Sequence, residues 1–157
     1  MSDSINLNDY LDTDQVLVKS EIISKKKLLE EMAKVLSQRL PDAKEKDIYH
    51  CLLEREKLGN TGVGNGVALP HSRSELTKTA VIAIITLNDP IDYDSIDKKP
   101  VDVAFGLLVP TEATSEHLNL LASIAKIMSD NEKKVQLSSA TTSQQAIQLI
   151  TNWSKAI

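Results

Sequence analysis

A glycine-rich stretch constrains this chain more than any other feature. Residues 59–73 read GNTGVGNGVALPHSR and hold four of the five glycines of the protein. Glycine adopts positive φ without strain and lets a backbone approach a ligand closely, while successive free N–H groups can hold an anion. Pro70 fixes its own φ and biases Leu69 towards an extended conformation, so we expect His71 on a stiff turn. A titratable nucleophile beside an anion cradle indicates phosphoryl chemistry on histidine.

Hydrophobic periodicity predicts where helices and strands lie. Helices are predicted at about residues 24–40, 43–58, 114–128 and 130–139. Ser24 and Thr114 are the predicted N-caps, and Thr142 with Gln145 resembles a capping box that opens a last helix, with Trp153 near its end. Strands are predicted at residues 15–18, 79–87 and 101–109, with a polar connection over residues 89–100.

The interleaving of strands and helices predicts an α/β fold with a central mixed β-sheet flanked by helices. At 157 residues, with 41% apolar and 25% charged residues, the chain has the size and composition of one ordinary domain. We therefore expect a single domain over residues 1–157, in which residues 1–15 form a loosely packed N-terminal arm.

Composition and charge argue against several classes of partner. A formal net charge of −4 with no basic stripe gives no footprint for nucleic acid. The longest apolar run, Val81 to Ile85, is far shorter than the roughly 20 residues that span a bilayer, so no membrane insertion is expected. The single cysteine cannot form an internal disulfide, and the polar N-terminus is unlike a secretory signal. These features predict a cytoplasmic protein.

Arg55 is a candidate to act together with His71. It lies three residues after Leu52, on the inward face of its predicted helix, one turn before the glycine-rich stretch. A planar guanidinium at this position could engage two phosphoryl oxygens together. The alternative is a salt bridge on the helix surface with Glu54 or Glu56.

His117 stands near the start of the helix predicted after Pro110, where the positive helix end favours an anion. Taken alone, a histidine at such a position is more often a cap or a core-edge side chain. His50 lies off the apolar stripe of its helix and is expected to be an exposed bystander. The three histidines lack the close spacing of metal ligands, and the glycine run lacks the Gly-Lys-Ser/Thr ending of a nucleotide loop. No metal or other cofactor is therefore expected.

The glycine-rich stretch resembles the active-site segment of the phosphotransferase-system enzyme IIA domains of the fructose, mannitol and nitrogen-regulatory type. The likeness covers nearly the whole chain and is closest to the nitrogen-regulatory branch. Besides residues 59–73 it includes LLERE at 52–56, PIDY at 90–93, KPVD at 99–102, LLVP at 107–110 and HLNLLA at 117–122. The resemblance implies the same α/β architecture.

The resemblance also implies roles for individual residues. It implies that His71 carries the phosphoryl group on Nε2 while a backbone carbonyl holds Nδ1–H, a choice of nitrogen that the residues alone leave open. It implies that Arg55 lies at the active site and that His117 faces His71 and hydrogen-bonds the phosphoryl group. Further candidates for lining the phosphate, in a loop that could instead be only a tight turn, are Thr61, Gly62, Gly64 and Ser72, the last of which replaces the family's usual glycine.

The function that the resemblance implies is that of a regulatory phosphocarrier, a phosphotransferase component. A phosphoryl group would pass from phosphoenolpyruvate through enzyme I and an HPr-like protein to His71. The phosphorylation state would then signal to regulated proteins such as transporters or kinases. The alternative within the family is a sugar-transport IIA that passes the group to a IIB domain. The alternative of another class is a non-catalytic regulatory binding module.

Overall fold

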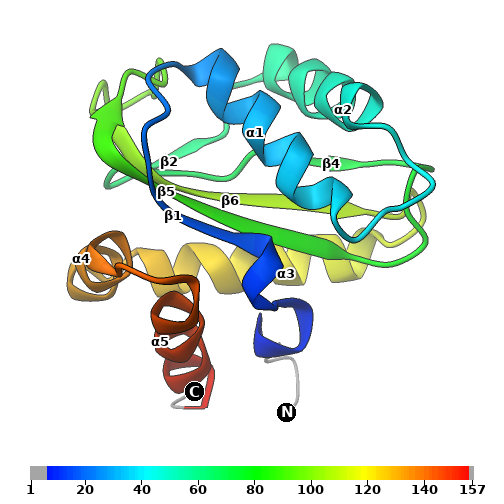
Figure 1. The fold of residues 1–157 in the computed structure, drawn as a ribbon. Helices are drawn as coiled ribbons and strands as arrows, with labels where there is room; N and C mark the ends of the chain where they lie inside the picture. The colour runs from blue at the N-terminus through cyan, green and yellow to red at the C-terminus, as the bar shows by residue number, and fades with distance from the viewer. Residues whose placement is uncertain (1–6, 156–157) are drawn as a thin grey trace.

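A single six-stranded sheet forms the centre of the computed structural model, which describes residues 7–155 (Figure 1). The strands are β1 (Val16–Ser20), β2 (Gly62–Gly64), β3 (Val67–Ala68), β4 (His71–Arg73), β5 (Val81–Ile91) and β6 (Val101–Val109). Their order is β1-β5-β6-β3-β2, and β4 also pairs with β6. β5 and β6 are antiparallel, whereas β1 is parallel to β5, and β3 and β4 are parallel to β6. The predicted mixed sheet is confirmed.

Helices cover both faces of this sheet. One face carries α1 and α2, and the opposite face carries α3, α4 and α5 (Figure 1). The helices are α1 (Lys25–Ser37), α2 (Glu45–Leu58), α3 (Thr114–Met128), α4 (Asn131–Ser139) and α5 (Ser143–Lys155). None of the helices within residues 7–155 is long and apolar enough to cross a membrane.

The two faces of the sheet bury separate apolar cores. Successive side chains of a strand point to opposite faces, so a continuous apolar run serves both. In β5, Ile82 and Ile84 pack with α3 and α5, whereas Ala83 and Ile85 pack with α1 and α2. The unbroken β-branched run in this part of the sequence is explained by burial on both sides.

Helix boundaries agree with local sequence signals at most ends. Ser24 caps α1 as predicted, since its Oγ accepts from the N–H of Lys27 at 3.1 Å, but the helix ends at Ser37 rather than near residue 40. The Oγ1 of Thr142 accepts from the N–H of Gln145 at 3.0 Å at the start of α5. The predicted cap at Thr114 is wrong, because this residue is already helical and Ala113 holds the N-cap position without a side-chain bond.

The N-terminal residues and the end of β5 differ from expectation. Residues 7–15 form two 3-10 turns, Leu7–Tyr10 and Thr13–Gln15, and the Tyr10 hydroxyl donates to Glu116 at 2.8 Å. The arm is therefore packed over this range, and residues 1–6 lie outside the described part.

β5 continues through Pro90 to Ile91, where an irregularity in its register with β6 accommodates a residue that has no N–H to donate.

Candidate functional site

His71 opens β4, at the edge of the sheet, where it pairs with Leu107 of β6. Its ring is partly buried, and Nδ1 lies 2.5 Å from the carbonyl oxygen of Leu69. A carbonyl can only accept, so Nδ1 carries the hydrogen and Nε2 keeps its lone pair. The stiff Leu69–Pro70 corner therefore presents a ring whose nucleophilic nitrogen is Nε2.

His117 lies against His71, as the resemblance implied. The two ring centroids are 5.2 Å apart, in an edge-on arrangement with 67° between the planes. His117 is in the first turn of α3, where its N–H bonds to the carbonyl of Ala113 at 3.0 Å. Its Nε2 is buried and has no hydrogen-bond partner among the described residues. A buried nitrogen without a partner is costly unless a ligand or water satisfies it.

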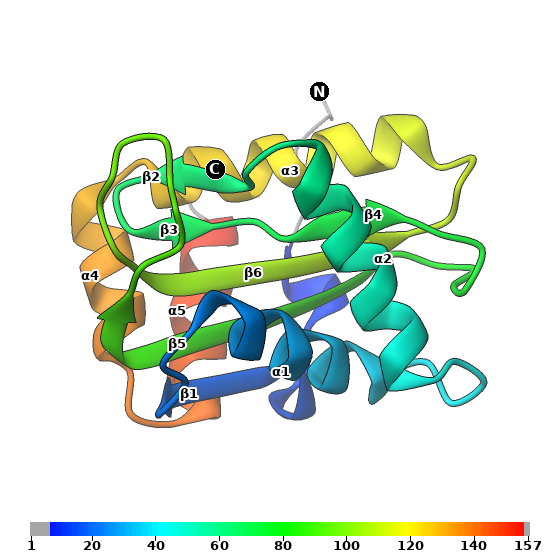
Figure 2. The ribbon, with the colours of Figure 1, turned by 90° about the horizontal axis from the view of Figure 1, so that it is seen from above.

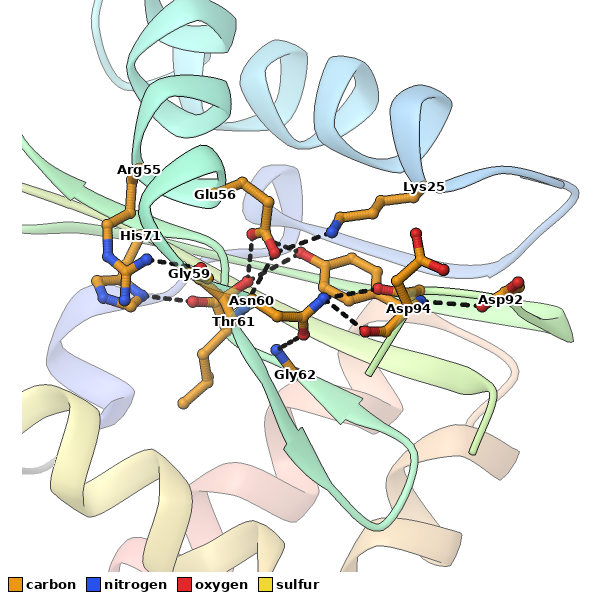
Figure 3. A network of polar contacts seen from close by, with 12 residues as sticks. Lys25, Arg55, Glu56, Gly59, Asn60, Thr61, Gly62, His71, Asp92 and Asp94 are labelled. Atoms are coloured by element: carbon orange, nitrogen blue, oxygen red, sulfur yellow. Dashed lines mark hydrogen bonds and ion pairs between the residues drawn. The ribbon is translucent and has the colours of Figure 1, made fainter. Parts of the chain in front are cut away.

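Arg55 lies in the last turn of α2, beside His71 (Figure 3). Its Nη1 donates to the carbonyl of Gly59 at 2.8 Å, which holds the guanidinium over the start of the glycine-rich stretch. The surface salt bridge considered as an alternative is not formed within residues 7–155. Glu54 pairs with Lys57, and Glu56 pairs with Lys25, each at 3.0 Å.

The environment lowers the pKa of both histidines below the ordinary value. For His71, burial is the main cause and the charge of Arg55 adds to it, although the Leu69 carbonyl and Glu56 act in the opposite direction. For His117, burial is again the first cause, followed by the charges of His71, Arg73 and Arg55. Both imidazoles are therefore neutral at pH 7, which leaves Nε2 of His71 free to act as a nucleophile.

Thr61, a candidate for the phosphate site, is turned into the interior instead. Its N–H donates to Oε2 of Glu56 at 2.9 Å, and its hydroxyl donates to Oε1 of the same carboxylate at 2.6 Å. Both donors are thus occupied, and the sequence analysis missed the buried glutamate that occupies them. The signal was present, because Ile48, Leu52 and Glu56 repeat every four residues along the buried face of α2.

The expected anion cradle is a β-hairpin in the structure, formed by β2 and β3. The N–H of Gly62 donates to Oδ1 of Asn60 at 2.7 Å. Gly64 has φ of 94° and lies at the hairpin turn, opposite Val67. Val67 pairs with Val103, four residues before the partner of His71 along β6, which separates the turn from His71 by roughly 13 Å. The β2–β3 hairpin therefore lies towards the opposite end of β6 from β4, as Figure 2 also shows.

Ser72 points away from the histidine pair, because neighbours in a strand face opposite sides of the sheet. The following same-side residue, Ser74, contacts Cys51 of α2, with 3.5 Å between oxygen and sulfur. Arg73 shares the side of His71 instead, and its Nη1 donates to Oγ1 of Thr114 at 3.1 Å. The sequence analysis did not single out Arg73, although its spacing of two from His71 in an extended segment was the available signal.

The arrangement supplies a neutral imidazole nucleophile, a guanidinium and a second imidazole with an unsatisfied nitrogen. This set can bind and transfer an anionic group such as phosphoryl. Within residues 7–155 no group of three or more His, Cys, Asp or Glu side chains is arranged to hold a metal ion. The exposed His50 lies apart on α2.

Comparisons with known proteins find relatives over nearly the whole chain. Residues 9–153 match the family model described as phosphoenolpyruvate-dependent sugar phosphotransferase system, EIIA 2. The nitrogen regulatory protein of Pseudomonas aeruginosa is 39% identical over 146 residues, which cover 93% of this chain and 95% of that protein.

Two solved structures share the fold. The nitrogen regulatory protein IIA-Ntr from Neisseria meningitidis superimposes with a TM-score of 0.87 at 35% identity, covering 92% of this chain and 99% of that one. Enzyme IIAMTL, in a complex with phosphorylated enzyme IIBMTL from Escherichia coli, gives a TM-score of 0.77 at 14% identity, covering 90% and 97%. At that identity the second likeness concerns the fold alone.

Proposed function

Because this chain belongs to the EIIA 2 family of the phosphoenolpyruvate-dependent sugar phosphotransferase system, we propose that it is a regulatory phosphocarrier that accepts a phosphoryl group on Nε2 of His71. The observation that carries the proposal is the pairing of two imidazoles 5.2 Å apart at an open sheet edge. One of them has its Nδ1 hydrogen held by the Leu69 carbonyl, and the other has a buried Nε2 without a partner.

In the proposed transfer, the lone pair on Nε2 of His71 attacks the phosphorus of a phosphorylated donor protein. The new N–P bond forms as the bond from phosphorus to the donor breaks, and the donor leaves with that electron pair. The hydrogen on Nδ1 stays in place, so the Leu69 carbonyl stabilises the positive charge that develops on the ring. Catalysis of such a step is mostly positioning and electrostatic stabilisation.

Arg55 and His117 supply that stabilisation. The guanidinium of Arg55, already fixed by the Gly59 carbonyl, is placed to engage phosphoryl oxygens. A phosphoryl oxygen would also satisfy Nε2 of His117, if that nitrogen carries the hydrogen of the neutral ring. The N-terminal end of α3, where His117 lies, favours negative charge at the same place.

The surroundings of the pair suit a visiting protein such as an HPr-like donor. Leu58, one turn after Arg55 at the end of α2, is 85% exposed. Leu118, next to His117, is 61% exposed. Exposed large apolar side chains that border a polar site are typical of protein docking surfaces.

The extended likeness to nitrogen regulatory proteins, over more than nine-tenths of both chains, favours a signalling role over sugar transport. Phosphorylation would add about −1.5 to −2 charges to this surface, enough to recruit or reject a target such as a transporter or a kinase. The alternative, transfer onward to a IIB domain, is suggested by the fold shared with enzyme IIAMTL.

The test is incubation of the chain with phosphoenolpyruvate, enzyme I and an HPr-like protein. We expect one acid-labile, alkali-stable phosphate per chain, which is lost in His71→Ala and retained in His50→Ala, whose histidine is exposed on α2. If the wild-type chain accepts no phosphate under conditions in which the donor is phosphorylated, the proposal fails. The histidine pair would then belong to a non-catalytic binding module.

A further inference from the structure

A buried polar network lies near His71, on the side of the sheet that α1 and α2 cover (Figure 3). At its centre is Glu56, which is only 8% exposed. Its carboxylate accepts from the N–H and the hydroxyl of Thr61, from the Tyr93 hydroxyl at 3.1 Å, and from Lys25 Nζ at 3.0 Å. The Tyr93 oxygen also lies 2.9 Å from Oγ1 of Thr61, so the single hydrogen of Tyr93 is shared between that oxygen and the carboxylate.

This carboxylate is charged in spite of its burial. Burial alone would raise the pKa of Glu56, but hydrogen bonds from Thr61 and Lys25 hold it below the ordinary range. Ion pairs with little exposure are weak evidence for stability, because desolvation offsets most of the attraction. A charged network beside the proposed reaction centre therefore calls for an explanation other than stability.

A short chain of contacts joins Glu56 to His71. The carboxylate fixes Thr61 through both the N–H and the side chain. The carbonyl of Thr61 accepts from the N–H of Leu69 at 2.9 Å. The carbonyl of the same Leu69 accepts from Nδ1 of His71. The backbone of Leu69, whose carbonyl holds the imidazole hydrogen, is thus tied through its own N–H to a residue that the carboxylate holds at two points.

We propose that Glu56 is a positioning residue, whose carboxylate acts through Thr61 and the Leu69 peptide to keep His71 in the Nδ1–H tautomer with Nε2 directed to the incoming phosphoryl group. The effect of Glu56 on the rate of phosphorylation rests on the function proposed above, but its effect on the tautomer of His71 does not. Glu56 touches neither the phosphoryl group nor the imidazole directly.

The chemistry of the network requires a carboxylate at residue 56. Three of the groups around it, the Thr61 N–H, the Thr61 hydroxyl and the Lys25 ammonium, present hydrogens to the two oxygens. A carboxylate is acceptor-only, whereas an amide of the same shape must direct its NH₂ at one of these donors. Glu56→Gln should therefore release Thr61 without changing the volume of the site.

The first experiment compares the unphosphorylated wild type with Glu56→Gln and with the control Glu54→Gln, whose exposed carboxylate pairs only with Lys57 among the described residues. Imidazole ¹⁵N spectra report which nitrogen of His71 carries hydrogen. We expect the Nδ1–H tautomer in wild type and control, and a mixture of tautomers in Glu56→Gln. This readout needs no phosphoryl transfer, so it separates a failure of the inference from a failure of the proposed function.

The second experiment measures phosphorylation of His71 by the HPr-like donor. Loss of ring positioning should lower the rate at saturating donor about tenfold or more in Glu56→Gln, with little change in the donor concentration that gives half-maximal rate. Thr61→Val, which removes the hydroxyl but keeps the shape, should show the same tautomer mixture and slow rate. Thr61→Ser, which keeps the hydroxyl, should restore both.

Each result bears on the inference. If Glu56→Gln does not fold, as judged by its amide spectrum, the comparison of Thr61→Val with Thr61→Ser decides. An unchanged Nδ1–H tautomer in a folded Glu56→Gln or Thr61→Val variant would overturn the inference and leave the phosphocarrier role intact. Equal slowing in Thr61→Ser and Thr61→Val would overturn it as well, because the hydroxyl would then be irrelevant.

Discussion

For single residues, the proposed chemistry depends on where the hydrogen of each imidazole sits. His71 has Nδ1 bonded to a carbonyl, so its nucleophilic nitrogen is fixed by the backbone rather than by another side chain. His117 has a buried Nε2 that nothing in residues 7–155 satisfies. In the free protein, Nε2 of His117 is therefore available to hydrogen-bond a group bound beside His71. A preorganised site stabilises charge in this way, because its polar groups are already in place before the reaction.

His117→Ala should lower the rate of His71 phosphorylation by about 100-fold, the usual loss when one preorganised donor is removed from a reaction centre. Half-maximal donor concentration should change little, because the exposed apolar side chains around the site remain. Rapid-quench measurements with labelled phosphoenolpyruvate, and His50→Ala as control, provide the check. A rate equal to that of wild type would remove His117 from the mechanism.

The pKa values of the two histidines predict how stability changes with pH. Both folded-state pKa values are lowered from the ordinary 6.5, so the unfolded chain binds protons that the folded chain does not. The free energy of unfolding should therefore be at its full value above about pH 6.5 and fall as the pH drops through the folded-state pKa values. Protonation of Glu56, whose pKa is below its usual 4.5, belongs to a separate and more acidic range.

Urea titrations between about pH 5 and pH 7.5 cover the pH range in which the histidines titrate and lie above the range in which Glu56 is protonated. In His71→Gln the decrease in the free energy of unfolding towards acidic pH should be smaller than in the wild type. In the double variant with His117→Gln it should be smaller still. Parallel curves for the three proteins would show that neither histidine has a lowered pKa in the folded state.

At the scale of elements, the turn of the β2–β3 hairpin explains two of the four glycines in the glycine-rich stretch. Gly64, Asn65 and Gly66 have φ of 94°, 57° and 77°, which is the left-handed backbone of a tight turn. A side chain at Gly66 would also meet Lys134, whose Nζ lies 2.7 Å from the position of a Cβ. The turn therefore needs these glycines for its backbone conformation.

Gly64→Ala should destabilise the protein by about 1–2 kcal/mol, the cost of left-handed backbone for a residue with a Cβ. The rate of His71 phosphorylation should be unchanged, because the hairpin turn is at the far end of β6. The control is Gly59→Ala, where φ of 168° is extended and no atom lies within 4 Å of an added Cβ. Urea unfolding and the phosphorylation assay test both statements. A Gly64→Ala variant that is as stable as wild type but is phosphorylated slowly would indicate that this glycine belongs to the phosphate site.

Features that local chemistry decides could be predicted from the sequence, whereas features that strand pairing decides could not. The Ser24 cap, the end of α2 at Gly59 and the β6 span follow from local signals, and the structure has them. Thr61 and Ser72 were candidates for lining the phosphate in a loop that could instead be only a tight turn. In the structure Thr61 bonds to Glu56, and Ser72 faces the opposite side of β4 from His71. Which face of a strand a residue takes depends on register, and register is set by partners far along the chain.

The extension of β5 through Pro90 has the same cause. A proline usually argues against a central strand, yet here the ladder to β6 is interrupted between Thr86 and Ile91 and resumes at Val101. The missing N–H of Pro90 falls within that interruption. Nothing in residues 88–91 alone shows that pairing resumes, so the strand end could not be placed from sequence.

For the whole molecule, the residues of the proposed site come from both faces of the sheet. The α1–α2 side holds Arg55 and the Glu56 network, and the α3–α5 side holds His117. His71 stands at the edge strand β4, where both sides can reach it. This arrangement explains why residues far apart in the chain converge on one imidazole, and why the motif around His71 alone cannot specify the site.

Leu7, the first described residue of the N-terminal arm, belongs to the core on the α3–α5 side. Leu7 is 1% exposed and packs in the same apolar cluster as Ile150 and Trp153 of α5. Leu7→Ala should therefore destabilise the protein by about 2–5 kcal/mol, as truncation of a buried leucine does. Ile23→Ala, which shortens an apolar side chain that is 87% exposed, should stay within about 0.5 kcal/mol of wild type. Urea unfolding at constant pH measures both, and equal midpoints for the two variants would mean that the arm is loosely packed after all.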